Sequence, residues 1–149
     1  MPVIEVPGFS MLDEPRPIVP IGMYQARISG CTSDLVKKEG SKLLGSTYLK
    51  WEFTIEDPDA NEWNGRKLSH ITNLNDNVKT ADGQVDKDSV RQAAYFLSQF
   101  LDKLGVAYDP KKGNLDTDAA FGARAMIKVG HRLYQGTPQP NIEEVFKLS

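Results

Sequence analysis

The stretch GSTYLKWEFTI, at residues 45–55, alternates strictly between polar and apolar side chains from Tyr48 onward. A period of two that includes aromatic and β-branched residues is typical of a strand with one buried and one solvent-facing side. The core side is expected to carry Leu49, Trp51, Phe53 and Ile55, and the solvent side Tyr48, Lys50, Glu52 and Thr54. An aromatic ring followed by a lysine suits either a base-stacking platform or an ordinary solvated sheet surface.

The residues before this strand predict a hairpin. Residues 22–29 alternate in the same way, so that Tyr24, Ala26 and Ile28 would face the core. Residues 30–46, between the two strands, are rich in Gly, Ser and Lys and form a long loop in this interpretation. Such a loop is either simply solvated or a basic clamp for nucleic acid.

A third strand is expected at residues 65–74, after the acidic turn at residues 56–65, whose net charge is −4. Leu68 and Leu74 favour one buried face of this strand, whereas Ile71 favours the other. The sequence therefore does not decide which face of this strand is buried, and a β-bulge within the strand is one explanation of the mixed pattern.

Residues 89–104 have the periodicity of an amphipathic helix. Asp86 or Asp88 is positioned to cap its start, and Gly105 to end it in a left-handed conformation. The apolar stripe consists of Val90, Ala93, Ala94, Leu97, Phe100, Leu101 and Leu104.

Two more strands are expected, at residues 123–129 and 141–146, joined by a polar connection at residues 130–140. Three strands, a helix and two strands match the order of a five-stranded OB barrel, an all-β fold in which the helix plugs the barrel. The two long loops then fall where that fold grips its ligands. The alternative is an α+β sheet with a packed helix.

The length of 149 residues suits a single domain, predicted at residues 21–149. Residues 1–20 are Pro-rich and predict an N-terminal arm. In one interpretation the arm is flexible or extended. In the other it docks on its own domain, or on a neighbouring subunit so that a homo-oligomer forms. The apolar residues available for docking are Val3, Ile4, Val6, Phe9 and Ile18.

Composition excludes several classes. No apolar run is long enough to cross a membrane, and the first residues do not form a signal peptide. Cys31 is the only cysteine, which excludes an intramolecular disulfide and a multi-cysteine zinc site and favours the cytoplasm. A net charge of −2 argues against coating duplex DNA by charge alone, although residues 123–136 carry a net charge of +3.

Several short motifs follow one another between residues 22 and 136: G-x-Y-x-A-x-I, YLKWEFTI, N-G-R-K-L, FGARAMIKV and Y-Q-G. In this order they resemble the phage-encoded single-stranded DNA-binding proteins of OB fold, over about residues 22–146. The resemblance implies that the protein binds single-stranded DNA with little sequence preference. It would act in phage DNA replication, recombination or repair, in the cytoplasm of the host cell. Its protein partners would be replication or recombination proteins. The chain departs from many such proteins by ending in EEVFKLS rather than in an acidic tail.

Single-stranded binders combine a positive groove with aromatic rings on which bases stack. The candidate rings are Tyr48 and Tyr134. The candidate phosphate partners are Lys37, Lys38, Lys42, Lys50, Arg66, Lys67, Arg124, Lys128 and Arg132. Two of these assignments have ordinary alternatives, because Tyr48 also suits a cross-strand aromatic and Lys50 a solvated partner of Glu52.

An enzyme is not expected. His70 and His131 are the only histidines and neither lies in a catalytic motif. The acidic turn lacks a calcium-loop pattern, so neither a metal nor a cofactor is expected. The alternatives to DNA binding are an OB-like protein-interaction module of a phage or prophage and, less favoured by the lysine-rich loops, a carbohydrate-binding OB domain.

Overall fold

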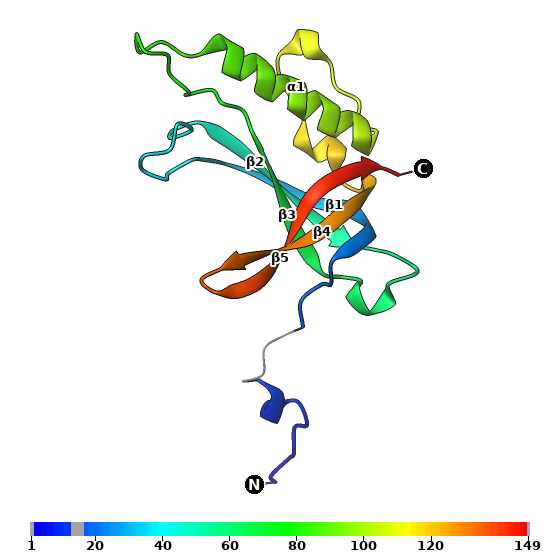
Figure 1. Ribbon diagram of the computed structural model, residues 1–149. Helices are drawn as coiled ribbons and strands as arrows, with labels where there is room; N and C mark the ends of the chain where they lie inside the picture. The colour runs from blue at the N-terminus through cyan, green and yellow to red at the C-terminus, as the bar shows by residue number, and fades with distance from the viewer. Residues whose placement is uncertain (1, 13–16, 149) are drawn as a thin grey trace.

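The computed structural model describes residues 2–12 and 17–148. Its mostly-β fold has one antiparallel sheet in the order β3-β2-β1-β4-β5 and, within the described residues, one α-helix (Figure 1). The elements are β1 (Gly22–Leu35), β2 (Thr47–Ile55), β3 (Lys67–Asn73), α1 (Lys87–Leu104), β4 (Arg124–Tyr134) and β5 (Thr137–Lys147). The predicted order of three strands, a helix and two strands is confirmed. No helix in the described part of the chain has the length and apolar character that a membrane span requires.

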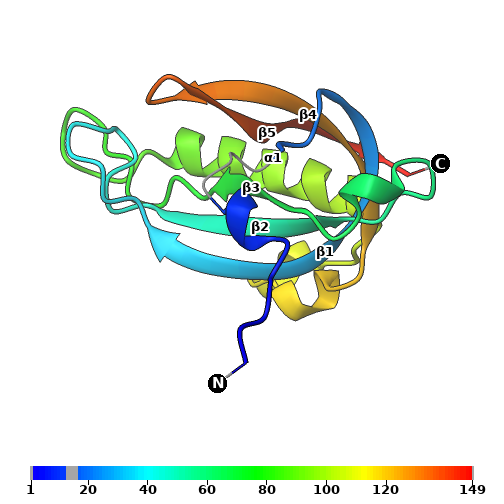
Figure 2. The ribbon, with the colours of Figure 1, turned by 90° about the horizontal axis from the view of Figure 1, so that it is seen from below.

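The sheet is strongly curved but open (Figure 2). β1 pairs with both β2 and β4, which leaves β3 and β5 as the two edges. The edge strands approach each other and α1 contacts both, yet no ladder joins them within the described residues. The closed barrel expected from the sequence is therefore not found.

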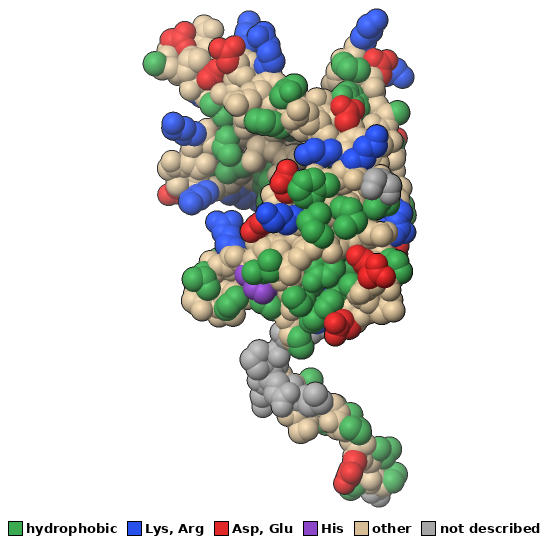
Figure 3. Space-filling view, turned by 45° about the vertical axis from the view of Figure 1, so that its right-hand side comes forward, with side chains coloured by type: hydrophobic (Ala, Val, Ile, Leu, Met, Phe, Trp, Pro, Cys, Tyr) green, Lys and Arg blue, Asp and Glu red, His purple; other side chains and the backbone are tan. Residues whose placement is uncertain are grey.

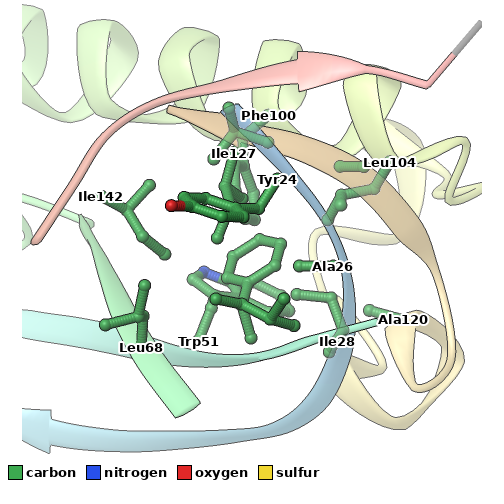
Figure 4. Packing of buried hydrophobic residues seen from close by; sticks show 14 of the residues in the cluster. Tyr24, Ala26, Ile28, Trp51, Leu68, Phe100, Leu104, Ala120, Ile127 and Ile142 are labelled. Carbon is green, nitrogen blue, oxygen red and sulfur yellow. The ribbon is translucent and has the colours of Figure 1, made fainter. Parts of the chain in front are cut away.

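The core lies inside this curved sheet, under α1 (Figure 4). Trp51 and Phe53 are fully buried on β2, and Phe100 of α1 packs on both rings, with centroid distances of 5.2 and 6.3 Å. All four core residues predicted on β2 are buried. Thr54, expected in solvent, is buried instead, and its hydroxyl donates to Ser29 Oγ at 2.7 Å.

β1 continues beyond residue 29, where it was predicted to end, as far as Leu35. A register shift between Ile28 and Gly30 marks a β-bulge, after which Cys31 pairs with Trp51 on the core side. The bulge reverses which residues face the core, so the simple alternation is lost and the strand looks like a loop in the sequence. The predicted β1–β2 hairpin is present, with a shorter connection.

The buried face of β3 is now determined. Leu68 is 7% exposed and Ile71 is 51% exposed, so the face that carries Leu68 is buried. Pairing with β2 is regular throughout, so the bulge expected here is absent from the β2–β3 ladder.

The predicted ends of α1 are confirmed, because the Asp86 side chain accepts from two backbone N–H groups at its start and Gly105 has a φ of 71° at its end. Ala94, assigned to the apolar stripe, is exposed.

The predicted polar loop at residues 130–140 is instead a two-stranded ribbon. β4 and β5 remain paired up to Tyr134 and Thr137, around a turn at Gln135 and Gly136, whose φ angles are 51° and 79°. The ribbon extends beyond the core, so both of its sides are exposed and no apolar alternation marks it in the sequence. On β5, prolines occupy positions 138 and 140.

The end of the predicted arm belongs to the folded body. Val19 is 1% exposed, and its carbonyl oxygen lies 2.8 Å from His131 Nε2. Further out, Val3, Ile4 and Phe9 are 97%, 78% and 68% exposed, so they do not dock on their own domain. Residues 1 and 13–16 of the predicted arm, and residue 149 of the predicted domain, lie outside the described residues.

Candidate nucleic-acid interface

The sheet surface that faces away from the core is called the outer face here. On β2 it carries Tyr48, Lys50 and Glu52, which alternate with buried residues. Strand pairing places Lys50 between Thr32 of β1 and Ile71 of β3. The predicted solvent-facing pair, an aromatic ring and a lysine, therefore lies on the central strand of a three-stranded surface, with Tyr48 near the end of that surface where β1 and β3 end.

Two hairpins flank this surface. The β1–β2 connection and the β4–β5 ribbon project from the same side of the body in both ribbon views (Figures 1 and 2). The first carries Lys37, Lys38 and Lys42, and the second carries Arg132 and Tyr134, all of them exposed. In the space-filling view, Lys and Arg side chains lie on the projections and over the body of the molecule, with Asp and Glu side chains among them (Figure 3).

Four of the predicted phosphate partners already contact a carboxylate. These ion pairs are Lys37–Asp34 at 3.8 Å, Lys67–Glu52 at 3.6 Å, Arg124–Glu56 at 3.3 Å and Lys128–Glu143 at 3.6 Å. A phosphate must compete with the carboxylate for each of these cations. We therefore expect them to contribute less to binding than unpaired cations.

Glu56, just after β2, holds two arginines together. Its carboxylate accepts from Arg27 Nε at 2.5 Å and from Arg124 Nη1 at 3.3 Å, and its backbone oxygen accepts from Arg124 Nη2 at 3.0 Å. This cluster ties the end of β2 to β1 and β4. Arg124 thus has a structural role in addition to the predicted one.

Arg66 is placed apart from the other candidates. It precedes β3, where its guanidinium lies 5.5 Å from the centre of the Trp63 ring. Its Nη2 also donates to the backbone oxygen of Pro17 at 2.8 Å. Arg66 therefore fastens the segment before β1 to the body.

The remaining predicted phosphate partners have side-chain charges that are free to contact a phosphate. Within the described residues, Lys38, Lys42, Lys50 and Arg132 have no carboxylate within 4.0 Å. The pairing of Lys50 with Glu52, considered as an alternative, is not found among the described residues, and the Glu52 carboxylate contacts Lys67. The structure thus brings together Tyr48 and Lys50 on the outer face, with unpaired cations on both hairpins.

A depression that the sequence did not predict lies beside Lys50. It has a volume of about 260 Å³ and is lined by Gly30, Cys31, Thr32, Lys50, Glu52 and Ser69. It lies beside the β1 bulge. A Gly in the middle of an otherwise strand-like segment is the sequence signal that points to such a bulge. Burial raises the pKa of the Cys31 thiol, which favours its protonated form.

A second cavity, of about 380 Å³, lies where β3, α1 and β5 diverge. His70 stacks on Phe100 beside it, with ring centroids 5.1 Å apart, and burial, followed by the charge of Lys103, lowers the pKa of this histidine. The described residues contain no cluster of three or more His, Cys, Asp or Glu side chains suited to a metal ion. Both histidines of the chain thus have structural contacts.

Comparison with protein-family models finds no matching family, and comparison with curated proteins finds no match. The resemblance to phage-encoded single-stranded DNA-binding proteins therefore stays a prediction. Function has to be inferred from the physical properties of Tyr48, Lys50 and the two hairpins.

Proposed function

We propose that the protein binds single-stranded DNA with little sequence preference and without catalysis, in phage DNA replication, recombination or repair. The observation that carries this proposal is the pair Tyr48 and Lys50 on the outer face, flanked by two hairpins with unpaired cations. A tyrosine ring stacks on any base, and lysine ammonium groups neutralise phosphates. Both interactions tolerate any sequence.

The fold that we propose is an OB-fold variant. Support comes from the pairing of β1 with both β2 and β4, from the position of α1 between β3 and β4 in the chain, and from the approach of β3 to β5. OB barrels share this order of elements and bind oligonucleotides around their second and third strands. Here the final ladder, between β3 and β5, is not formed.

Single-stranded DNA fits this surface better than duplex DNA. A duplex keeps its bases stacked inside, where a tyrosine on a sheet surface cannot reach them, and binds mainly through many phosphate contacts. The chain has a net charge of −2 and several of its outer-face cations are paired. Stacking on Tyr48 therefore has to supply part of the affinity.

The test is fluorescence anisotropy of labelled oligo(dT) over a salt series. Trp51 is fully buried and Trp63 packs against Arg66 beyond the end of β2, so a label on the DNA reports binding better than tryptophan emission. Lys38, Lys42, Lys50 and Arg132 together predict a slope of about −3 for log K against log salt, since a single strand contributes about −0.7 for each neutralised phosphate. Absence of binding at low salt would contradict the proposal.

Lys50→Ala tests the charge on the sheet surface. Because Lys50 has no carboxylate partner within the described residues, we expect its removal to make the salt slope shallower by about 0.7. Lys128→Ala is the matched comparison, and the contact of Lys128 with Glu143 predicts a smaller change. An equal change in both variants would show that ion pairing does not decide which cations bind.

A second candidate function, a protein-interaction module, is favoured by the exposed apolar side chains of Val3, Ile4 and Phe9. Its partners would be replication or recombination proteins, or a second copy of the chain, docked on the arm. In that case a variant lacking residues 2–12 loses partner binding or self-association, and no oligonucleotide binds the full chain.

A further inference from the structure

The depression beside the β1 bulge is open enough to admit one base. Gly30 forms part of its wall, and a Cβ atom built on Gly30 would meet only Glu52 Cβ, at 4.0 Å. Lys50, Thr32 and Ser69 also line it, so its wall combines a cation, hydroxyl groups and the Glu52 carboxylate. It lies on the outer face, where Lys50 and Glu52 of its wall are successive outward-facing residues of β2 and Tyr48 is the one before them.

The Glu52 carboxylate is held in place at one of its oxygens. Oε1 accepts from Ser29 Oγ at 2.8 Å and lies 3.6 Å from Lys67 Nζ. Within the described residues, Oε2 has no hydrogen-bond partner. Glu52 therefore presents an oriented acceptor that remains free for a ligand.

A free carboxylate oxygen distinguishes the two pyrimidines. Cytosine presents the N4 amino group, a donor that Glu side chains accept from, whereas thymine presents O4, an acceptor, at the same position. Thymine would place two acceptors against each other, which is repulsive. The hydroxyls of Thr32 and Ser69 donate or accept, so they tolerate either base.

We infer that Glu52 reads one base in this depression and gives the protein a preference for cytosine over thymine, while Lys50 holds the adjoining phosphate. The inference rests on the proposed binding of single-stranded DNA. Stacking and phosphate contacts elsewhere are insensitive to sequence, so the preference is modest and confined to one position of the bound strand.

The test compares oligo(dC) and oligo(dT) of equal length at the same salt and at slightly alkaline pH, where cytosine is unprotonated. We expect the native chain to bind oligo(dC) about three- to tenfold more tightly. Equal affinities would overturn the inference and leave the proposed function standing. If neither oligonucleotide binds, the proposed function fails, and the inference fails with it.

Two variants assign the preference to this site. In Glu52→Gln the amide both accepts and donates, so the ratio of affinities should fall towards one. Gly30→Val fills the depression without changing charge and should also remove the preference. Glu62→Gln, on an exposed turn, removes the same charge as Glu52→Gln and should keep the ratio of the native chain. A ratio that survives in both site variants would overturn the inference.

Discussion

Tyr48 supplies the aromatic ring on the outer face, where it is half-exposed between Asp34 and Asn73 of the neighbouring strands. Stacking of one base on such a ring is worth about 1–3 kcal/mol. Tyr48→Ala should therefore weaken oligo(dT) binding by roughly 5- to 150-fold, without lowering the melting temperature. Anisotropy and circular dichroism measure the two effects.

The control for this substitution is Tyr95→Ala. Tyr95 is a 59% exposed tyrosine on α1, away from the outer face. Its removal should leave DNA affinity unchanged. Equal losses in the two variants, or unfolding of Tyr48→Ala, would contradict the assignment of Tyr48 as the stacking ring.

His70 links stability to pH. Its pKa is lowered in the folded protein, first by burial and then by the charge of Lys103, whereas the unfolded chain has the ordinary value of about 6.5. Below that value the unfolded state binds the proton more readily, so the free energy of unfolding should fall as the pH drops from about 7 to about 5.5. Above it, His70 has no such effect.

Urea unfolding at these two pH values checks this expectation. In His70→Gln the loss of stability between them should be smaller than in the native chain. His131→Gln, which removes the other histidine of the chain, is the comparison variant, and the expectation is met if the loss shrinks only in His70→Gln. An unchanged loss in His70→Gln would assign the pH dependence to other groups.

Residue patterns predicted the exposed ring and lysine but not the ion pairs. The alternation around Tyr48 and Lys50 is a local property of one strand, so the sequence displays it directly. The contact of Arg124 with Glu56 joins residues 68 positions apart and depends on how β2, β1 and β4 align. Such alignment is a property of the folded sheet.

Among the elements, α1 offers a clear stability test. The Asp86 side chain accepts from the backbone N–H groups of Asp88 and Ser89, at 3.1 and 3.3 Å. Asp86→Ala leaves these donors without a cap and should lower the free energy of unfolding by about 1 kcal/mol. Asp88→Ala, in the same first turn, should have a smaller effect. Chemical denaturation of the two variants distinguishes a cap from a general effect of negative charge.

The β4–β5 ribbon was predicted to be a loop, and its residues show why. Its residues are polar and contain glycine and prolines, which usually indicates a loop, and a ribbon without a core leaves no apolar alternation. Gln135-Gly136 forms a two-residue turn in which both φ angles are positive, and of the two residues only Gly136 marks such a turn in the sequence. Hairpins favour this turn because its twist matches that of the paired strands.

At the scale of the whole molecule, the arm and the body respond differently to substitution. Residues 2–12 carry exposed apolar side chains, whereas Val19 is in the core. Deleting residues 2–12 should leave the melting temperature unchanged, while Val19→Ala should lower the free energy of unfolding by about 1–3 kcal/mol. Differential scanning calorimetry of both variants, which measures the melting temperature and the enthalpy of unfolding, tests whether the arm is independent of the folded body. A large loss on deletion would show that the arm stabilises the body.

The order of elements was predictable because each strand and the helix carries its own periodicity. Closure of the sheet was not, since it depends on whether the edges of β3 and β5 meet along their length. Residue patterns describe which face of a strand is buried. They do not describe the distance between two edges that are far apart in the chain.

The prolines of β5 have a consequence for how the molecule behaves at high concentration. The turn at Gln135 and Gly136 closes on the hydrogen-bonded pair Tyr134 and Thr137, and hydrogen-bonded pairs alternate with non-bonded ones along the ribbon. Pro138 and Pro140 therefore occupy non-bonded positions, where a backbone N–H would point away from β4. The exposed edge lacks the donors that another chain needs to add a strand, which protects this ribbon against edge-to-edge aggregation.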